Sequence, residues 1–275
     1  MSSDNSPIGV FDSGLGGLSV LKVLAKRFPS EEFLYLGDTA RLPYGSKSPE
    51  TIQQYTVQNL KWLASRNCKV LIIACNTASS HFHKNEFQGI PVYDVIAPGS
   101  KMALQTSKTK VIGVLGTRAT IQSQSYVKKI HEYDPKAKVI VQSCPMFVPL
   151  VEEDWNDDPI TNLIVFRYIQ SLRNQDDDEM MDSLVLGCTH YPFLRESIQK
   201  AVGQNIQLIE SGEALAAKLN EDIKNNRWKI NPQSGGEEKQ ALIRLASTDR
   251  SDFFENLARK LLSPFAPQEF ELVNL

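Results

Sequence analysis

The sequence predicts an α/β protein built from two pseudo-symmetric lobes, each with a mainly parallel sheet, and with the active site in the cleft between them. Two observations predict this class. Short apolar segments alternate with amphipathic stretches from one end of the chain to the other, which is the rhythm of βαβ units. In addition, part of this pattern recurs in the second half of the chain, in the same order and at similar spacing.

The predicted strands are apolar segments rich in Val, Ile and Leu, and most are continuous rather than alternating. Strands buried on both faces of a parallel sheet have this composition. In chain order, the predicted strands are Ile8–Phe11, Phe33–Leu36, Val70–Ala74, Val92–Ile96, Val111–Leu115, Val139–Gln142, Leu184–Leu186, Ile206–Ile209, Ala241–Ala246 and Phe270–Val273.

The predicted helices are the amphipathic stretches between these strands. In chain order they are Leu18–Phe28, Pro49–Arg66, Ile121–Tyr133, Ile160–Leu172 and Phe193–Val202. A further helix is expected after the strand at Val70–Ala74, where it would carry His81 and His83 away from the strand ends. An exposed turn is expected at Asn231–Gly236, which is rich in Pro, Ser and Gly.

Two pairs of segments indicate an internal repeat. Ile8–Val10 is echoed by Ile112–Val114, and Leu71–Thr77 is echoed by Leu184–His190. In the second pair, each apolar strand ends in a small residue, a cysteine and polar groups. Two equivalent lobes would explain both pairs. We therefore expect a discontinuous lobe of residues 1–97 and 212–275, a second lobe of residues 98–211, and hinges near Ala97-Pro98-Gly99 and Glu210-Ser211-Gly212.

The composition is that of an ordinary globular protein. Hydrophobic residues make up 41% of the chain and charged residues 23%, which excludes a disordered or collagen-like chain. Lys and Arg number 30 against 32 Asp and Glu, and this balance argues against a basic nucleic-acid-binding surface. The apolar runs fall far short of the roughly 20 residues that cross a bilayer, and the first residues lack the pattern of a secretory signal. We therefore expect a cytoplasmic protein with no membrane partner.

Ligands of open parallel sheets bind beyond the carboxyl ends of the strands, so the residues that follow each predicted strand are candidates for a site. Small polar groups, carboxylates and thiols collect there. In chain order they are Asp12, Ser13, Asp38, Thr39, Tyr44, Gly45, Cys75, Asn76, Thr77, Thr117, Thr120, Cys144, Glu152, Cys188, Thr189 and His190. We expect them to share one rim.

The four cysteines are too few and too scattered for a disulfide framework, and we expect free thiols. A lone cysteine at a strand end is usually a small buried hydrophobic residue, and we interpret Cys68 and Cys144 in this way. Cys75 and Cys188 stand at matching ends of the repeated strands, beside polar residues, which favours a pair of facing reactive thiols. His190 is placed to carry a proton or to stabilise charge beside Cys188.

Neither a cofactor nor a metal is expected. The segment Asp12–Gly17 contains half of a dinucleotide-binding fingerprint, but Ser19 occupies the position of its third glycine. The glycines more simply allow a tight turn into the following helix. The cysteine and histidine groups lack the spacing of zinc sites; these groups are Cys75 with His81 and His83, and Cys188 with His190.

Two opposed thiols suit one reaction in particular. One thiolate removes a proton from a carbon centre and the other thiol returns a proton to the opposite face, which inverts the configuration. A free thiol has a pKa of about 8.5, so a thiolate and a thiol can coexist near neutral pH when their surroundings differ. Backbone amides and Asn or Thr donors in a cleft without water would stabilise the carbanion.

Five segments of the chain are distinctive sequence motifs: GVFDSGLGG at 9–17, GDTARLPYG at 37–45, ACNTAS at 74–79, PLVE at 149–152 and LGCTHYP at 186–192. They resemble the signatures of the glutamate racemase family, within the aspartate/glutamate racemase superfamily. The matches occur in order between Ile8 and Gly212. The chain departs from the family at Glu210, where an aspartate is more usual, and residues 213–275 match no signature.

The resemblance implies a cofactor-independent amino-acid racemase in which Cys75 and Cys188 are the paired bases. It implies that Asp12 and His190 assist the thiols, and that Glu152 is a further acidic helper. By analogy with the family, Cys75 would deprotonate the D-isomer and Cys188 the L-isomer. The substrate contacts that the motifs imply are Asp12, Ser13, Tyr44, Gly45, Asn76, Thr77, Thr189 and His190, with Thr117 and Thr120 as weaker candidates.

The resemblance also implies a biological setting. The substrates would be L- and D-glutamate, the chain would form a homodimer, and the D-glutamate would supply peptidoglycan synthesis in a bacterial cytoplasm.

Three other functions remain open at this stage. A racemase of the same superfamily acting on aspartate, hydantoin or another acid would share the two thiols. A two-lobed binding protein could close on an acidic metabolite without turning it over, although it would have no need of paired thiols. A thiol hydrolase would use one cysteine with a His/Asn pair and no second equivalent cysteine.

Overall fold

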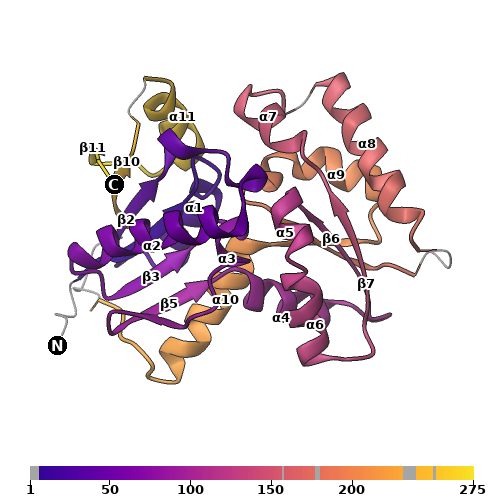
Figure 1. Cartoon of the computed structure of the whole chain (residues 1–275), viewed down its shortest axis with the longest axis horizontal. Coiled ribbons are helices and arrows are strands. Elements are labelled where there is room, and N and C mark those ends of the chain that lie inside the picture. The colour runs from indigo at the N-terminus through magenta and orange to yellow at the C-terminus, as the bar shows by residue number, and fades with distance from the viewer. Residues whose placement is uncertain (1–5, 157, 177–179, 232–239, 250–251) are drawn as a thin grey trace.

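The computed structural model describes residues 6–156, 158–176, 180–231, 240–249 and 252–275, and these residues form two sheets that lie side by side (Figure 1). Within this part of the chain, one sheet has seven strands in the order β11-β10-β2-β1-β3-β5-β4, and the other has four in the order β7-β6-β8-β9. Neighbouring strands are parallel except for the antiparallel pair of β4 and β5. The predicted α/β class with mainly parallel sheets is confirmed.

The strands agree with the continuous apolar segments of the sequence. They are β1 (Ile8–Asp12), β2 (Glu32–Gly37), β3 (Val70–Ile73), β4 (Glu86–Phe87), β5 (Ile90–Asp94), β6 (Val111–Gly116), β7 (Lys138–Ser143), β8 (Ser183–Gly187), β9 (Gln207–Glu210), β10 (Leu242–Ser247) and β11 (Glu269–Leu272).

Helices cover both faces of the sheets. They are α1 (Leu18–Arg27), α2 (Pro49–Ser65), α3 (Asn76–Ser79), α4 (Ile96–Thr106), α5 (Arg118–Gln122), α6 (Ser125–Tyr133), α7 (Phe147–Glu152), α8 (Pro159–Arg173), α9 (Arg195–Val202), α10 (Ser211–Lys224) and α11 (Asp252–Leu262). Short 3-10 turns lie at η1 (Thr39–Arg41), η2 (Tyr44–Ser46) and η3 (Tyr191–Leu194). In the described ranges, no helix combines the length and apolar character that crossing a membrane requires.

The two sheets repeat one topology. The strand order β2-β1-β3-β5 of the first sheet corresponds to the order β7-β6-β8-β9 of the second. The repeated sequence segments occupy equivalent central strands, because β1 corresponds to β6 and β3 corresponds to β8. Cys75 and Cys188 therefore follow equivalent strands, as the sequence echo predicts.

Each sheet is buried on both faces, which explains why its strands are apolar at successive positions. In the first sheet, Val10 and Ile72 belong to one core, while Phe11 and Ile73 belong to the core on the other face. The second sheet is packed in the same way, with Leu115 and Val114 in different cores.

The structure differs from the predicted elements at several places. Strand β4 is absent from the prediction because two residues give too short a pattern. The strand predicted to end at Ile96 ends at Asp94, whose carboxylate accepts hydrogen bonds from the amides of Ile96 and Ala97 and so begins α4. The helix predicted at Ile121–Tyr133 is broken into α5 and α6, because Gln124 adopts a left-handed conformation with φ of 55°.

The prediction of a helix that carries His81 and His83 is wrong. Helix α3 ends at Ser79, so both histidines lie beyond it. The turn predicted at Asn231–Gly236 lies, apart from Asn231, outside the described residues.

Two helices join the sheets at the predicted hinges. Helix α4 begins at Ile96 and packs against β8 and β9 of the second sheet. Helix α10 packs against α1 on one side and α4 on the other, as Figure 1 shows near the middle of the molecule. The lobe boundaries at 97/98 and 211/212 stay a prediction.

Replacing Gly187 by alanine should destabilise the fold. A Cβ atom at Gly187 would lie 2.5 Å from the carbonyl oxygen of Leu115 in the neighbouring strand, so β6 and β8 would have to separate. We expect the free energy of unfolding to fall by about 1–3 kcal/mol, the usual cost of overpacking, as measured by urea denaturation. Gly14→Ala is the matched control, since its Cβ meets no atom closer than 3.5 Å. Equal stability of the two variants would contradict this packing.

Candidate active site

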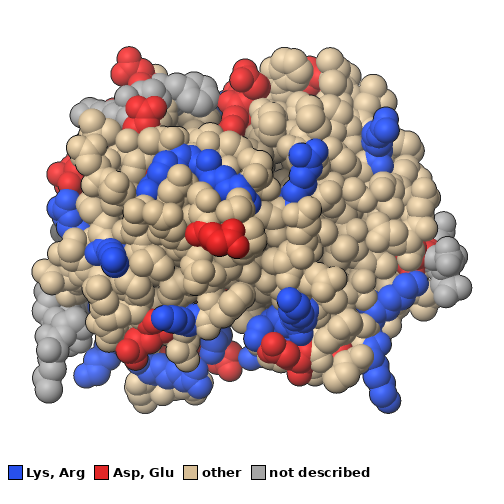
Figure 2. All heavy atoms as spheres, in the orientation of Figure 1, with Lys and Arg blue, Asp and Glu red and all other residues tan. Residues whose placement is uncertain are grey.

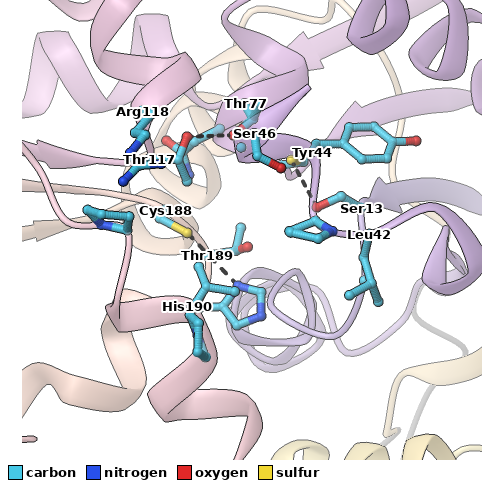
Figure 3. Close-up of a pocket in the computed structure, with 18 of the residues that line it drawn as sticks. Ser13, Leu42, Tyr44, Ser46, Thr77, Thr117, Arg118, Cys188, Thr189 and His190 are labelled. Atoms are coloured by element: carbon cyan, nitrogen blue, oxygen red, sulfur yellow. Dashed lines mark hydrogen bonds between the residues drawn. The ribbon is translucent and has the colours of Figure 1, made fainter. Parts of the chain in front are cut away.

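A cavity of about 150 Å³ lies where the carboxyl ends of strands from the two sheets face each other. Ser13, Cys75 and Thr77 come from the first sheet, and Thr117, Cys188 and His190 come from the second (Figure 3). The whole lining consists of Ser13, Gly14, Leu42, Pro43, Tyr44, Gly45, Ser46, Cys75, Asn76, Thr77, Thr117, Arg118, Cys144, Pro145, Val148, Pro149, Glu152, Cys188, Thr189 and His190. A space of this size suits a small metabolite.

Cys75 presents its thiol at the start of α3. Its Sγ accepts a hydrogen bond from the amide of Ala78 at 3.5 Å and donates one to Ser13 Oγ at 3.4 Å. Burial raises the pKa of this thiol to about 12, and the nearby Asp12 carboxylate adds to the increase, while the two hydrogen bonds oppose it. Cys75 is therefore a protonated thiol at neutral pH.

Cys188 stands in a different electrostatic environment. Its Sγ lies 3.9 Å from Nδ1 of His190, and Nε2 of His190 lies 3.3 Å from a carboxylate oxygen of Glu152. Burial alone would lower the pKa of His190, but the contacts with Cys188 and Glu152 outweigh it and raise the pKa to about 10. The imidazole ring is therefore positively charged near neutral pH, directly beside the second thiol.

Asp12 lies beneath the cavity and does not line it. The carboxylate is fully buried at the end of β1, where it accepts hydrogen bonds from the amide of Gly14 at 3.0 Å and from Thr189 Oγ1 at 3.2 Å. Burial raises its pKa, against the opposing influence of His190 and these hydrogen bonds. Asp12 therefore influences the pKa of Cys75 and holds Thr189, the neighbour of Cys188. It was also predicted as a direct substrate contact, but it is not among the residues that line the cavity.

Three threonine hydroxyls join the two halves of the site. Oγ1 of Thr77 lies 2.9 Å from Oγ1 of Thr117 and 3.3 Å from Oγ1 of Thr120, and the last two are 3.0 Å apart. Thr77 and Thr117 line the cavity, whereas Thr120 lies behind them. The hydroxyls satisfy one another and hold the ends of β3 and β6 together.

Two predicted contact residues line the cavity while their polar side-chain groups are engaged elsewhere. The hydroxyl of Tyr44 is buried against Asp38 and Asn59. The amide group of Asn76 accepts a hydrogen bond from Tyr126 at 2.6 Å and donates one to Ser211 at 3.2 Å. Asn76 can still offer a ligand its main chain and the second N–H of its side-chain amide.

The other predicted contacts, Ser13, Gly45, Thr77, Thr189 and His190, all line the cavity together with Glu152 and both cysteines. Asp38 and Thr39 of the predicted rim do not; Asp38 is buried in an ion pair with Arg41. His81 and His83 also lie outside the lining.

Cys144 was predicted both on the rim and as a buried hydrophobic residue. It lines the cavity, and its side chain is buried in the core, where burial raises the pKa of its thiol well above the usual range. Sequence reasoning did not single out Arg118, which lines the cavity as well. A signal for Arg118 was present in the sequence, since it stands between the two candidate threonines Thr117 and Thr120.

The arrangement is suited to moving protons on two faces of one small molecule. Each thiol comes from its own sheet, and apolar groups such as Leu42, Pro145 and Val148 complete the walls. Charge that develops on a ligand in such a cavity interacts strongly with fixed donors, because little water screens it.

Comparisons with known proteins agree with this geometry. Residues 8–219 match the family model described as Asp/Glu/Hydantoin racemase. A protein of Chlorobaculum tepidum named glutamate racemase is 40% identical over 276 residues, which cover 99% of this chain and 98% of that protein.

Two solved structures are similar over the whole chain. A glutamate racemase isoform of Bacillus anthracis has a TM-score of 0.90 at 33% identity, covering 99% of both chains. A glutamate racemase of Francisella tularensis, solved in complex with D-glutamate, has a TM-score of 0.86 at 34% identity, covering 99% of this chain and 98% of that one.

Replacing Glu152 by glutamine should change how stability depends on pH. The pKa of His190 rises from 6.5 to about 10 in the fold, so its contribution is fully present below the unfolded pKa and is lost as the pH rises through about 10. Without the Glu152 charge the folded pKa of His190 is lower, so less stability is lost between these two values. Urea denaturation across this range, with ring NMR signals of His190, measures both effects.

The control for this experiment is Glu153→Gln, which removes an exposed neighbouring charge. Ionisation of buried thiols such as Cys75 also lowers the stability of the fold at high pH, but it does so equally in the wild type and both variants. Identical pH profiles for Glu152→Gln and wild type would show that Glu152 does not set the charge of His190.

Proposed function

The chain belongs to the Asp/Glu/hydantoin racemase family, and on that premise we propose that it interconverts L-glutamate and D-glutamate by a cofactor-independent, two-cysteine mechanism. One observation carries the proposal: Cys75 and Cys188 follow equivalent strands of the two sheets and line one cavity. The choice of glutamate is supported by the relatives named glutamate racemase and by the D-glutamate complex of the Francisella tularensis protein.

In the proposed reaction, one sulfur takes the proton from the α-carbon, and the electron pair of the broken C–H bond remains on the substrate as a planar carbanion. The other thiol gives its proton to the opposite face. No oxidant, reductant or leaving group is needed. Following the family's mechanism, Cys188 removes the proton of the L-isomer and Cys75 that of the D-isomer.

The surroundings of the thiols favour one resting state. Cys75, with a pKa of about 12, holds its proton, while the charged ring of His190 lies 3.9 Å from Cys188 Sγ and stabilises negative charge there. This state can act on L-glutamate at once. After turnover the protons are reversed, and the opposite state can act on D-glutamate.

Each assisting group has a proposed role that follows from its contacts. Glu152 keeps His190 charged through their 3.3 Å contact. Asp12 holds Thr189 in place through a hydrogen bond and helps to raise the pKa of the Cys75 thiol. Main-chain amides of Ser13, Gly45, Asn76, Thr77 and Thr189 are proposed to bind the substrate's carboxylates and to stabilise the carbanion.

The proposed biological role follows from the product. D-glutamate made in a bacterial cytoplasm would supply peptidoglycan synthesis. We also propose a homodimer, because α8 exposes several large apolar side chains. Leu163 is 70% exposed, and Ile160 and Phe166 are each 53% exposed. In Figure 2 the surface over α7 and α8 carries few charged side chains, which is typical of surfaces that bind another protein.

The racemase proposal predicts a specific isotope result. Purified protein mixed with L-glutamate in deuterated water, with no cofactor added, should reduce the circular dichroism signal of glutamate to zero while deuterium enters the α-carbon. Cys75→Ala and Cys188→Ala should each lower the racemisation rate by about 10²–10⁴-fold, as expected when one acid–base group is lost.

The control for these variants is Cys68→Ala, because Cys68 is buried away from the cavity lining. If the wild-type protein leaves glutamate unchanged but racemises L-aspartate, the substrate is a different amino acid and the proposed reaction type stands. If neither amino acid is racemised, the result would favour a binding protein and refute the proposal that the protein is a racemase. Cys75→Ser should also affect proton abstraction from the two isomers unequally; equal loss would contradict the assignment of each thiol to one isomer.

The homodimer proposal predicts that Leu163→Lys shifts the sedimentation coefficient to that of a monomer, because a buried unpaired charge opposes association. Analytical ultracentrifugation measures this. Gln105→Lys, an exposed substitution on α4, is the control and should sediment like wild type. A monomeric wild-type protein, or a Leu163→Lys variant that remains a dimer, would remove α8 as the contact surface.

A further inference from the structure

Tyr126 is a buried tyrosine of α6 at the junction of the two halves of the molecule. Its side chain is 2% exposed, and it is not among the described residues that line the cavity. Its helix packs against α4, which in turn packs against α10 (Figure 1). The hydroxyl of Tyr126 reaches the first half of the molecule, where it donates a hydrogen bond of 2.6 Å to Oδ1 of Asn76. A buried hydroxyl bonded in this way holds two elements in one relative position.

The ring of Tyr126 packs against the main chain at two glycines. A Cβ atom at Gly187 would lie 3.2 Å from Cε2 of the ring, and a Cβ atom at Gly99 would lie 3.3 Å from Cε1. Gly187 ends β8 and precedes Cys188, while Gly99 belongs to α4 at one of the predicted hinges. Tyr126 therefore contacts the segment that carries Cys188 with its ring and the residue that follows Cys75 with its hydroxyl.

Two neighbours set the orientation of the side-chain amide of Asn76. Tyr126 donates to its oxygen, and its nitrogen donates to Ser211 Oγ at 3.2 Å. Ser211 is the first residue of α10, at the second predicted hinge. Burial raises the pKa of Tyr126, so the hydroxyl keeps the proton that its bond requires. Because this proton goes to Oδ1, the amide nitrogen faces Ser211 and its second N–H is left for a ligand.

Holding Asn76 also holds Cys75. Asn76 is the first residue of α3, a helix of four residues, and Cys75 is the N-cap residue whose Sγ accepts a hydrogen bond from the amide of Ala78. A helix this short has little stability of its own, so contacts from outside must fix its first turn. Tyr126 supplies such a contact from the half of the molecule that carries Cys188.

Resting on the proposed function, we infer that Tyr126 is a positioning residue whose hydroxyl fixes Asn76 and thereby keeps the Cys75 thiol aligned with the α-carbon of the substrate. Tyr126 touches no substrate and transfers no proton. It acts on the barrier to proton transfer at Cys75, because displacement of a reacting group by about 1 Å can cost about 10²-fold in rate.

The first test is Tyr126→Phe, which keeps the ring and removes only the hydroxyl. We expect kcat for both isomers of glutamate to fall about 10- to 100-fold while KM stays within about threefold of wild type. The amide of Asn76 can then turn over, since Ser211 Oγ also lies 3.5 Å from Oδ1 and can donate or accept. An unchanged kcat, or a loss confined to KM, would overturn the inference.

Isotope effects separate a displaced thiol from partly unfolded protein. With α-deuterated substrates, the isotope effect on kcat/KM should rise in Tyr126→Phe for D-glutamate, whose proton Cys75 takes in the proposed reaction. It should fall for L-glutamate, because transfer at Cys75 becomes the slowest step in both directions. An unfolded fraction lowers kcat but changes neither isotope effect. The same isotope effects in Tyr126→Phe and wild type would therefore contradict the inference.

A double-mutant cycle identifies the residue through which Tyr126 acts. In an Asn76→Ala background, Tyr126→Phe should change kcat/KM by less than about twofold, because its hydrogen-bond partner is already absent. A loss as large as that in the wild-type background would show that Tyr126 acts by another route. The matched control is Tyr133→Phe, which removes the hydroxyl of a half-exposed tyrosine on the same helix and should behave like wild type.

Nuclear magnetic resonance of the Asn76 side-chain amide separates this inference from the proposed reaction. The two N–H signals of the amide, identified by their absence in Asn76→Ala, should shift in Tyr126→Phe and stay in place in Tyr133→Phe. If wild type does not racemise glutamate but these signals shift, the proposed reaction fails and the anchoring of Asn76 by Tyr126 stands. If the signals of wild type and Tyr126→Phe coincide, this inference fails.

Discussion

The site depends on one buried hydrogen bond between the two halves of the molecule. Asp12 ends β1 in a position without water, and a carboxylate there must be satisfied by protein donors. Two donors are the amides of Gly14 and Gly17, and a third is the hydroxyl of Thr189, which follows Cys188 after the end of β8 in the other sheet. Satisfying Asp12 therefore fixes the end of β8 against the end of β1, and this places the two thiols on one cavity.

The loop after β1 makes this approach possible because of its glycines. A Cβ at Gly16 would lie 2.4 Å from both His190 Nδ1 and Thr189 Oγ1, and a Cβ at Gly17 would lie 2.4 Å from Asp12 Cβ. The glycines thus provide space for the second half of the site, and they need not bind a nucleotide to explain their presence. A further contact joins the same two segments, since Ser19 Oγ donates a hydrogen bond to the carbonyl oxygen of Thr189 at 2.8 Å.

The sequence predicted the elements of the fold more completely than the orientation of individual side chains. Continuous apolar segments and the repeat around Cys75 and Cys188 specify strands and their equivalence, because both depend on local patterns. The engagement of Asn76 depends on Tyr126, which is 50 residues away in the sequence. That of Tyr44 depends on Asp38 and Asn59, which only the fold brings together around its hydroxyl. Arg118 was missed for a related reason: an arginine at a helix start is usually solvated, and only the fold brings it to the cavity.

Thermodynamics limits what the unequal surroundings of Cys75 and Cys188 can do to the two directions of the proposed reaction. In water the two enantiomers of an amino acid have the same free energy, so for the proposed reaction kcat/KM must be equal in the two directions, however different the thiols are. The charged His190 beside one sulfur, and the burial of the other, can only redistribute this common value between kcat and KM for each isomer. Evolution of such a pocket can therefore tune which isomer saturates the enzyme first, but it cannot make the protein a one-way catalyst.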